Sequence, residues 1–166
     1  MIVAEPLVDS ELLAAFWQRG QEVGAIPVNR RAPDAVERFG DSPELADELV
    51  ALVLKGPKRA TAGSLAAFER EDAPLPLVGD HWAVVDGAGR PRAVLCTTEV
   101  RVGPLSSVDD AFAWAEGEGD RTRASWLADH EAYFRRELAS LDLPFDPDMS
   151  TVFERFDVVY TEEAGA

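Results

Sequence analysis

The chain has 166 residues, of which 46% are hydrophobic, and this is enough for a single domain with a sizeable core. Its 31 acidic and 16 basic residues give a formal net charge of −15, which argues against binding to long DNA or RNA because phosphate backbones attract basic surfaces. A small anionic or nucleoside ligand is compatible with this charge. No run of about 18 uncharged apolar residues occurs, and Glu5, Asp9 and Glu11 fall where a signal peptide would be apolar or basic, so we expect a cytoplasmic protein without a membrane partner.

Two helices are predicted in the first third of the chain. The first covers residues 9–19, where apolar side chains recur at helical spacing: Leu12, Leu13, Phe16 and Trp17. A loop follows up to residue 39. The second helix has Ser42 as its capping residue and Pro43 in its first turn. It ends at Gly56, because glycine permits the left-handed turn that closes a helix.

A strand over residues 61–65 and a hairpin of residues 81–85 and 92–102 are predicted next. Alternation in the second hairpin strand divides its residues between two faces. We expect one face to point to the core, with Val94, Cys96, Thr98, Val100 and Val102, and the other to point away, with Leu95, Thr97, Glu99 and Arg101. The lone Cys96 cannot form an internal disulfide, and we expect a small core residue there.

The last third predicts two helices and a strand. The helices cover residues 107–115 and 121–140, the second capped by Asp120, and the strand covers residues 152–160. Between the helices lies Glu116-Gly117-Glu118-Gly119-Asp120, which is either a solvated corner or a loop that approaches a ligand closely. Its three carboxylates could also hold Mg²⁺ or Ca²⁺, although it lacks the length of a calcium loop. The order of helices and strands predicts an α+β fold.

The chain contains only two lysines, Lys55 and Lys58, at the predicted end of the second helix. A buried lysine can lose its charge, whereas arginine stays charged. The two lysines either only offset the dipole at the helix end or form part of a site. The segment from Gly56 to Thr61 is not a Walker phosphate loop, since it follows a helix and lacks the Gly-Lys-Ser/Thr ending.

Several other side chains have two interpretations. Glu99 lies either at an exposed edge or in a polar cavity, because a buried carboxylate needs a partner. His130 either packs on an aromatic stripe or contacts a substrate. No His/Cys cluster suits zinc, and we expect no cofactor. The tryptophans are expected mainly in the core, although a nucleobase pocket would need one such plane: Trp82, Trp114 and Trp126.

The chain resembles the ASCH domain family, whose fold is similar to the PUA β-barrel. The resemblance rests on five motifs whose order and spacing are fairly specific together: Gly56-x-Lys58-x-x-Thr61, Leu77-Val78-Gly79-Asp80, Cys96-Thr97-Thr98-Glu99-Val100, the Glu-Gly-Glu-Gly-Asp loop and Phe153-Glu154-Arg155-Phe156. It implies a PUA-like mixed barrel flanked by helices over residues 38–162. Residues 1–37 would form an additional N-terminal helix and loop.

The family is linked to RNA binding, ribonuclease activity and hydrolysis of N4-acetylcytidine. The resemblance to its amidohydrolases implies Lys58 as proton acceptor, Thr61 as nucleophile and Glu118 as proton donor, with Glu116 as the alternative acid. Substrate-binding positions are expected at five residues: Lys55, Arg59, Glu99, Glu116 and His130. The chain differs from the small amidohydrolases in its longer acidic loop and its additional N-terminal helix. These differences bear on the identity of the substrate more than on the identity of the site residues.

Three functions follow from this resemblance. In the first, Thr61 attacks an N4-acyl cytidine amide while Lys58 acts as general base and Glu118 as general acid. Because Glu118 and the net charge favour the protonated lysine, Lys58 could instead be a fixed cation for an oxyanion or a phosphate. The second function is an RNA-binding or RNA-cleaving module that uses the same cleft. The third is a nucleoside sensor without catalysis.

Overall fold

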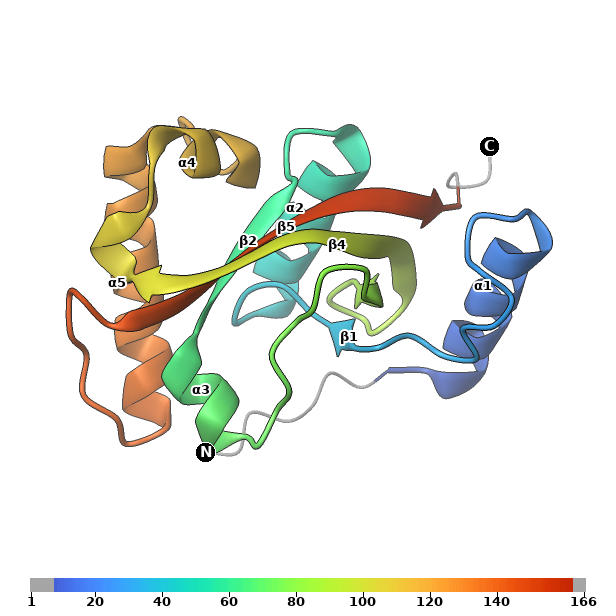
Figure 1. The fold of residues 1–166 in the computed structure, drawn as a ribbon, viewed down its shortest axis with the longest axis horizontal. Helices are drawn as coiled ribbons and strands as arrows, with labels where there is room; N and C mark the ends of the chain where they lie inside the picture. Colours follow the sequence, from blue (N-terminus) through green and yellow to red (C-terminus); the bar gives the residue numbers. More distant parts are fainter. Residues whose placement is uncertain (1–7, 163–166) are drawn as a thin grey trace. The chain divides into compact units, whose positions relative to one another are not determined.

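The computed structural model describes residues 8–162 (Figure 1). Its helices are α1 (Ser10–Glu22), α2 (Pro43–Lys55), α3 (Leu65–Arg70), α4 (Asp110–Glu116) and α5 (Arg123–Ser140). Its strands are β1 (Val36–Glu37), β2 (Ala60–Ser64), β3 (His81–Val85), β4 (Pro91–Pro104) and β5 (Ser150–Thr161). Hydrogen bonds link the strands in the order β1-β3-β4-β5-β2, with β1 parallel to β3 and the pairs β3–β4 and β2–β5 antiparallel. The predicted α+β class is confirmed, with a mixed sheet.

The described chain divides into two compact units, each built from separate segments. Unit 1 contains Pro57–Val78 and Thr98–Arg155, and unit 2 contains residues 8–56, 79–97 and 156–162. Strands β4 and β5 each pass from one unit into the other. None of the helices between residues 8 and 162 has the length and hydrophobicity that crossing a bilayer requires.

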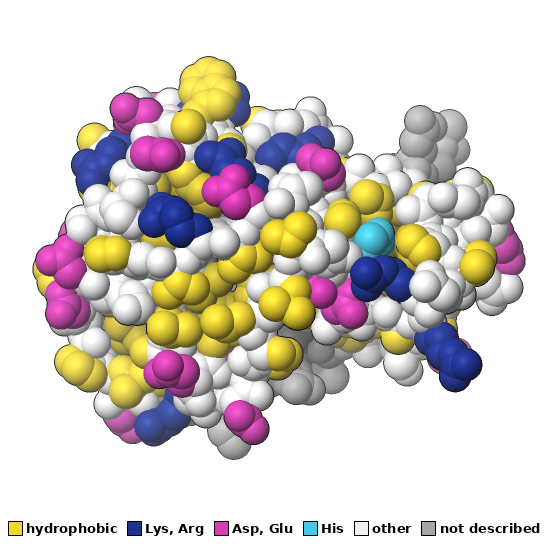
Figure 2. Space-filling view, viewed as in Figure 1, with side chains coloured by type: hydrophobic (Ala, Val, Ile, Leu, Met, Phe, Trp, Pro, Cys, Tyr) yellow, Lys and Arg dark blue, Asp and Glu magenta, His cyan; other side chains and the backbone are white. Residues whose placement is uncertain are grey.

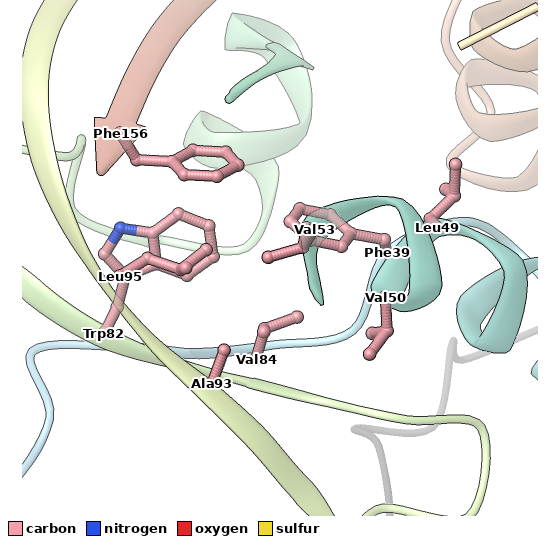
Figure 3. Close-up of a cluster of buried hydrophobic side chains, with 9 residues drawn as sticks. All are labelled: Phe39, Leu49, Val50, Val53, Trp82, Val84, Ala93, Leu95 and Phe156. Carbon is pink, nitrogen blue, oxygen red and sulfur yellow. The ribbon is translucent and has the colours of Figure 1, made fainter. Parts of the chain in front are cut away.

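The core of unit 2 forms where helix α2 packs near strands β3 and β4 (Figure 3). Helix α2 has the predicted ends: Ser42 Oγ accepts a hydrogen bond from Leu45 N, and Gly56 has φ +110°. Trp82 and Phe156 meet edge to face, with ring centroids 5.5 Å apart. These aromatic and aliphatic contacts exclude water from the hairpin, which is the main source of its stability.

The residues of strand β4 lie on two faces as predicted, but the assignment of one face to the core and the other to the outside is wrong. Leu95 packs in the cluster with Trp82, whereas Val94 packs with Phe16 of helix α1. Both faces of the strand are therefore covered at this point, so consecutive residues are buried although their side chains still alternate between the two faces. Further along, Thr97 is buried, with its hydroxyl 3.1 Å from Trp82 Nε1, while two residues of the expected core face are exposed: Thr98 and Val102.

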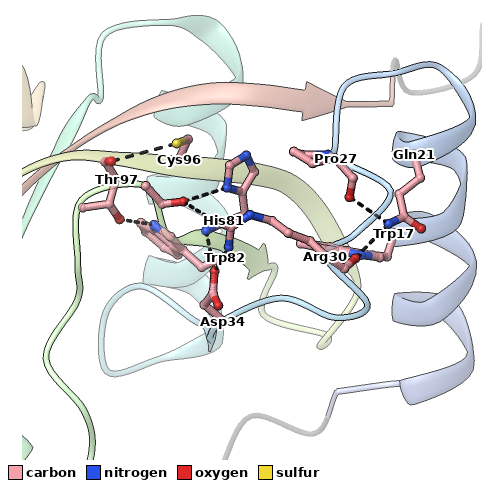
Figure 4. Close-up of polar contacts among 10 residues, drawn as sticks. Trp17, Gln21, Pro27, Arg30, Asp34, His81, Trp82, Cys96 and Thr97 are labelled. Carbon is pink, nitrogen blue, oxygen red and sulfur yellow. Dashed lines mark hydrogen bonds and ion pairs between the residues drawn. The ribbon is translucent and has the colours of Figure 1, made fainter.

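Polar contacts hold the segment after helix α1 to the rest of unit 2 (Figure 4). The carbonyl oxygen of Arg30 accepts hydrogen bonds from Trp17 Nε1 at 2.9 Å and from Gln21 Nε2 at 2.8 Å. The Arg30 guanidinium donates to the Gly79 carbonyl at 2.8 Å, and His81 Nδ1 lies 2.9 Å from the same oxygen. His81 thus has a structural explanation.

Unit 1 combines the pair β2–β5 with helices α3, α4 and α5. Its core is a cluster of mostly aromatic and aliphatic side chains: Ala60, Leu105, Val108, Phe112, Ala113, Trp126, Phe134 and Phe153. The predicted strand over residues 61–65 ends earlier, because Ser64 caps helix α3 by accepting from Ala67 N. Likewise, Thr122 caps helix α5 in place of Asp120, whose carboxylate accepts from Thr122 N.

Candidate functional site

Lys58 is a buried lysine at the start of unit 1, with 1% of its side chain exposed. Its Nζ donates to the Ala60 carbonyl at 2.9 Å and to Glu118 Oε1 at 2.8 Å. Glu116 Oε1 lies 3.6 Å from the same nitrogen. A buried ammonium needs such partners, because removing a charge from water without compensation is very unfavourable. Glu118 is 24% exposed, so the ion pair reaches from the interior to the surface.

Two backbone features bring the lysine turn against the end of helix α4. Arg59 N donates to the Ala115 carbonyl at 2.6 Å. Gly117 has φ +72°, and a Cβ added there would lie 2.6 Å from the carbonyl carbon of Pro57. Glycine at this position therefore permits both the left-handed turn and the close approach of the two segments.

Glu116 is the most enclosed acid of the site, and both of its oxygens lie within hydrogen-bond distance of a ring nitrogen. Trp126 Nε1 donates to Oε2, and His130 Nε2 lies 2.9 Å from Oε1. Burial raises the pKa of Glu116, but the charges of Lys58 and His130 and the two hydrogen bonds outweigh it, so the pKa lies below its usual range. We call these five residues the Lys58 cluster: Lys58, Glu116, Glu118, Trp126 and His130.

His130 is buried and fixed on three sides. Its ring stacks on Trp126, with centroids 3.8 Å apart and planes 10° apart. Its Nδ1 lies 2.9 Å from the Trp126 carbonyl oxygen, one helical turn earlier. Burial lowers the pKa of His130, but the charge and hydrogen bond of Glu116, with a further contribution from Glu118, raise it above the ordinary value. Aromatic packing and a polar contact are thus both present.

Two carboxylates and a histidine in this cluster also have a spacing that a cation could use. One ligand atom from each of Glu116, Glu118 and His130 lies within 4.8 Å of the others. The Lys58 ammonium already lies among these oxygens and supplies a positive charge there. The Lys58 ammonium therefore accounts for the close approach of the two carboxylates.

The remaining predicted site residues lie in different surroundings. Thr61 is half-buried on strand β2, next to the Ala60 carbonyl that accepts from Lys58, and Arg59 is half-buried with its Nη1 2.6 Å from the Lys58 carbonyl. Glu99 is 61% exposed, 3.7 Å from Arg155, which matches its exposed-edge interpretation. Lys55 is exposed on the last turn of helix α2, in unit 2.

One aromatic side chain of helix α4 is unexpectedly exposed. Trp114 is 60% exposed, and the Arg121 guanidinium stacks on its ring at 3.6 Å and donates to its carbonyl oxygen. The core expectation therefore holds for Trp82 and Trp126 but not for Trp114. Acidic and basic side chains are interspersed over the face drawn in Figure 2.

Trp126 is the site residue that the sequence did not indicate beyond its place in the core. The signal was its spacing of four residues from His130, which puts both rings on one face of helix α5. That spacing predicts a stacked pair. It does not predict the carboxylate that both rings bind, because Glu116 comes from another helix.

Comparisons with known proteins agree with this architecture. A family model described as ASCH domain matches residues 35–160. The crystal structure of protein EF3133 from Enterococcus faecalis V583, of family DUF984, is similar, with a TM-score of 0.80, 35% identity, and coverage of 90% of this chain and 88% of that chain. An ASCH domain structure from Lactobacillus crispatus JV V101 has a TM-score of 0.80, 28% identity, and coverage of 90% and 95%. No curated protein matches the chain significantly. The family match includes every residue of the Lys58 cluster.

Proposed function

The chain belongs to the ASCH domain family, and we propose that it hydrolyses the amide of an N4-acylated cytidine-type nucleoside at Lys58, Thr61 and Glu118. The observation that carries the proposal is the ion pair between Lys58 Nζ and Glu118 Oε1, 2.8 Å apart, with a buried nitrogen and a partly exposed carboxylate. Amide hydrolysis needs a base for the nucleophile and an acid for the leaving amine, and this pair can supply both. The proposal includes a cytoplasmic location.

The ion pair becomes an acid and a base by moving one proton. Lys58 transfers it along the hydrogen bond to Glu118, which leaves a neutral amine and a neutral carboxylic acid. The amine then takes the hydroxyl proton of Thr61 as Oγ1 attacks the acyl carbonyl carbon. The ammonium formed again at Lys58 stabilises the negative charge on the carbonyl oxygen.

The reaction is completed in two further steps. Glu118 gives its proton to N4 as the C–N bond breaks, which releases cytidine and leaves the acyl group as an ester on Thr61. A second proton transfer from Lys58 to Glu118 prepares the site for water, whose proton goes to Lys58 as its oxygen attacks the ester. Thr61 Oγ1 leaves with the proton of Glu118, and the released acid ionises in solution to acetate when the acyl group is acetyl.

The test is turnover of N4-acetylcytidine by the wild type, Lys58→Arg and Lys55→Arg. We expect cytidine release by the wild type and a loss of about 100-fold or more in Lys58→Arg, because arginine cannot act as a base. Lys55→Arg is the matched control and should keep full activity, because a contact of the exposed Lys55 with the substrate would need only the positive charge that arginine keeps. No turnover by the wild type would refute the hydrolase. Full activity of Lys58→Arg would refute the base role, and ligand binding without turnover would favour a sensor.

A second candidate function is binding of short single-stranded RNA. It is favoured by Trp114, an exposed ring with Arg121 stacked on it, since bases stack on such planes and arginine attracts phosphate. Filter binding of a short RNA at rising salt concentration tests it. We expect binding that weakens steeply with salt and falls in Trp114→Ala. Absence of binding at low salt would exclude this function.

A further inference from the structure

Glu116 and His130 form a buried pair that the proposed reaction does not use. The Trp126 carbonyl oxygen can only accept a hydrogen bond, so His130 Nδ1, 2.9 Å away, must carry a hydrogen. His130 Nε2 and Glu116 Oε1 are also 2.9 Å apart, and that contact needs a hydrogen on one of the two atoms. The pair is either an imidazolium beside a carboxylate or a neutral ring beside a carboxylic acid. In both cases it holds one proton and its net charge is zero.

The surroundings of the pair leave little freedom for another arrangement. Both side chains are buried, the ring is held by its stack on Trp126, and the second Glu116 oxygen accepts from Trp126 Nε1. Three charged groups meet there: Glu116 from helix α4, Glu118 from the loop after it and Lys58 from the turn before strand β2. If Glu116 were ionised beside a neutral His130, Lys58 would be the one of these groups that compensates its buried charge.

The charge of the pair determines what Lys58 experiences. With Glu116 as a bare anion, the ammonium would face two negative charges, at 2.8 Å from Glu118 and 3.6 Å from Glu116. With Glu116 neutralised by His130, the ammonium faces one net negative charge, that of Glu118. Transfer of the Lys58 proton to Glu118 is then no longer opposed by the negative charge of Glu116.

We infer that Glu116 and His130 hold one proton between them as a neutral positioning pair beside the Lys58 ammonium, so that of the two carboxylates near Lys58 only Glu118 carries an uncompensated negative charge. The catalytic consequence of this inference rests on the proposed hydrolase function, whereas the proton count of the pair does not. His130 is therefore a positioning residue and does not act on the substrate.

The proton count is measured by NMR without any substrate. The chain has two histidines, so His81→Gln leaves His130 as the only imidazole, and 15N and carboxyl 13C shifts at neutral pH report the ring and Glu116. The 13C signal is assigned with Glu116→Gln. Two protonated ring nitrogens beside an ionised Glu116, or a neutral ring beside a protonated Glu116, support the inference. A neutral ring beside an ionised Glu116 overturns it.

The consequence for Lys58 is measured by the pH dependence of N4-acetylcytidine turnover. His130→Gln keeps a donor near Glu116 but removes the shared charge, so the pH at which activity rises should move up by about one pH unit or more. Adding Glu116→Gln to His130→Gln removes the negative charge that His130 no longer neutralises. The pH at which the activity of this double variant rises should therefore return to that of the wild type. His81→Gln is the control and should match the wild type. Equal midpoints in His130→Gln and the wild type would overturn the catalytic consequence.

The two arms separate the two proposals. If the wild type shows no turnover, the hydrolase fails while the NMR measurement still decides the state of the pair. If turnover occurs but His81→Gln shows a neutral His130 ring and an ionised Glu116, the hydrolase stands and the inference fails. If His130→Gln does not fold, the NMR arm alone decides, since it keeps His130.

Discussion

Two carboxylates of the described chain, Asp86 and Glu116, are almost completely buried, and their partners differ in kind. Asp86 accepts from the backbone N–H groups of Ala88 and Arg90 at 3.0 Å and lies 3.3 Å from the Arg90 and Arg92 guanidinium groups. These contacts close the turn between β3 and β4, so Asp86 has a structural role. The charged partners of Glu116, Lys58 and His130, are themselves buried, which is typical of a functional site.

Asp86 should make unfolding depend on pH. Burial raises its pKa, but the hydrogen bonds from Arg90, Ala88 and Arg92 lower it below the usual range. A lowered pKa in the folded state gives stability that is present above the unfolded-state pKa and is lost as the pH falls through the folded-state pKa. Asp86→Asn should therefore lower the free energy of unfolding by about 1–3 kcal/mol at neutral pH and by less near about pH 3.

Urea unfolding at the two pH values checks this prediction. The matched control is Asp157→Asn, an exposed aspartate on strand β5, which should leave the free energy of unfolding nearly unchanged at both pH values. Asp86→Asn that loses the same stability at both pH values would contradict a role for the ionised carboxylate.

The sequence named candidate site residues, but it did not specify their contacts. Lys58 and Glu118 followed from the resemblance, and the structure places them 2.8 Å apart. The choice between Glu116 and Glu118 stayed open because a loop register cannot be read from one sequence, and both in fact contact Lys58. The contact of His130 with Glu116 depends on how the chain turns at Gly117, which no local pattern specifies.

Among the elements, the junction of helix α4 with the lysine turn is the most sensitive to substitution. Gly117→Ala would place a Cβ 2.6 Å from Pro57 C and 2.8 Å from Lys58 N, in addition to the strain of φ +72°. Gly56 also has a positive φ, +110°, but no heavy atom lies within 4 Å of a Cβ added there. Gly56→Ala is therefore the control for backbone strain alone. We expect Gly117→Ala to lose more stability than Gly56→Ala, by about 1–3 kcal/mol.

Thermal unfolding of both variants, with Lys58-dependent turnover as a second readout, measures this difference. Gly117→Ala should also lose turnover, because the clash displaces the Lys58 backbone, whereas Gly56→Ala should keep most of it. Equal melting temperatures and equal activity in the two variants would show that the close approach at Gly117 has no effect.

Elements with complete local signals were the ones that the sequence predicted well. Helix α2 has its cap at Ser42 and its stop at Gly56, so both ends are specified by a few neighbouring residues. Strand β1 was missed because it has two residues, Val36 and Glu37, and exists only through pairing with strand β3. Helix α3 was missed because its cap, Ser64, is also the last residue of a strand.

At the scale of the whole molecule, the net charge of −15 should govern encounters with nucleic acids. We expect no binding of long duplex DNA at about 0.15 M salt, because the acidic net charge of the protein repels the phosphate backbone at distances up to the Debye length of about 8 Å. Fluorescence anisotropy with a long duplex measures this, with a short single-stranded RNA under the same conditions as the comparison. Tight, salt-dependent binding of the duplex would contradict the prediction.

The central claim is that Lys58 and Glu118 divide the base and acid roles of amide hydrolysis. The most direct test compares Glu118→Gln with the wild type on N4-acetylcytidine and on p-nitrophenyl acetate, whose leaving group departs without a proton. We predict a loss of about 100-fold or more in turnover of the amide and a clearly smaller loss in the first-turnover release of p-nitrophenol, because formation of the acyl-enzyme from the ester needs the Lys58 base but no protonated leaving group. An equal loss on both substrates, or an unchanged rate on the amide, would contradict the account.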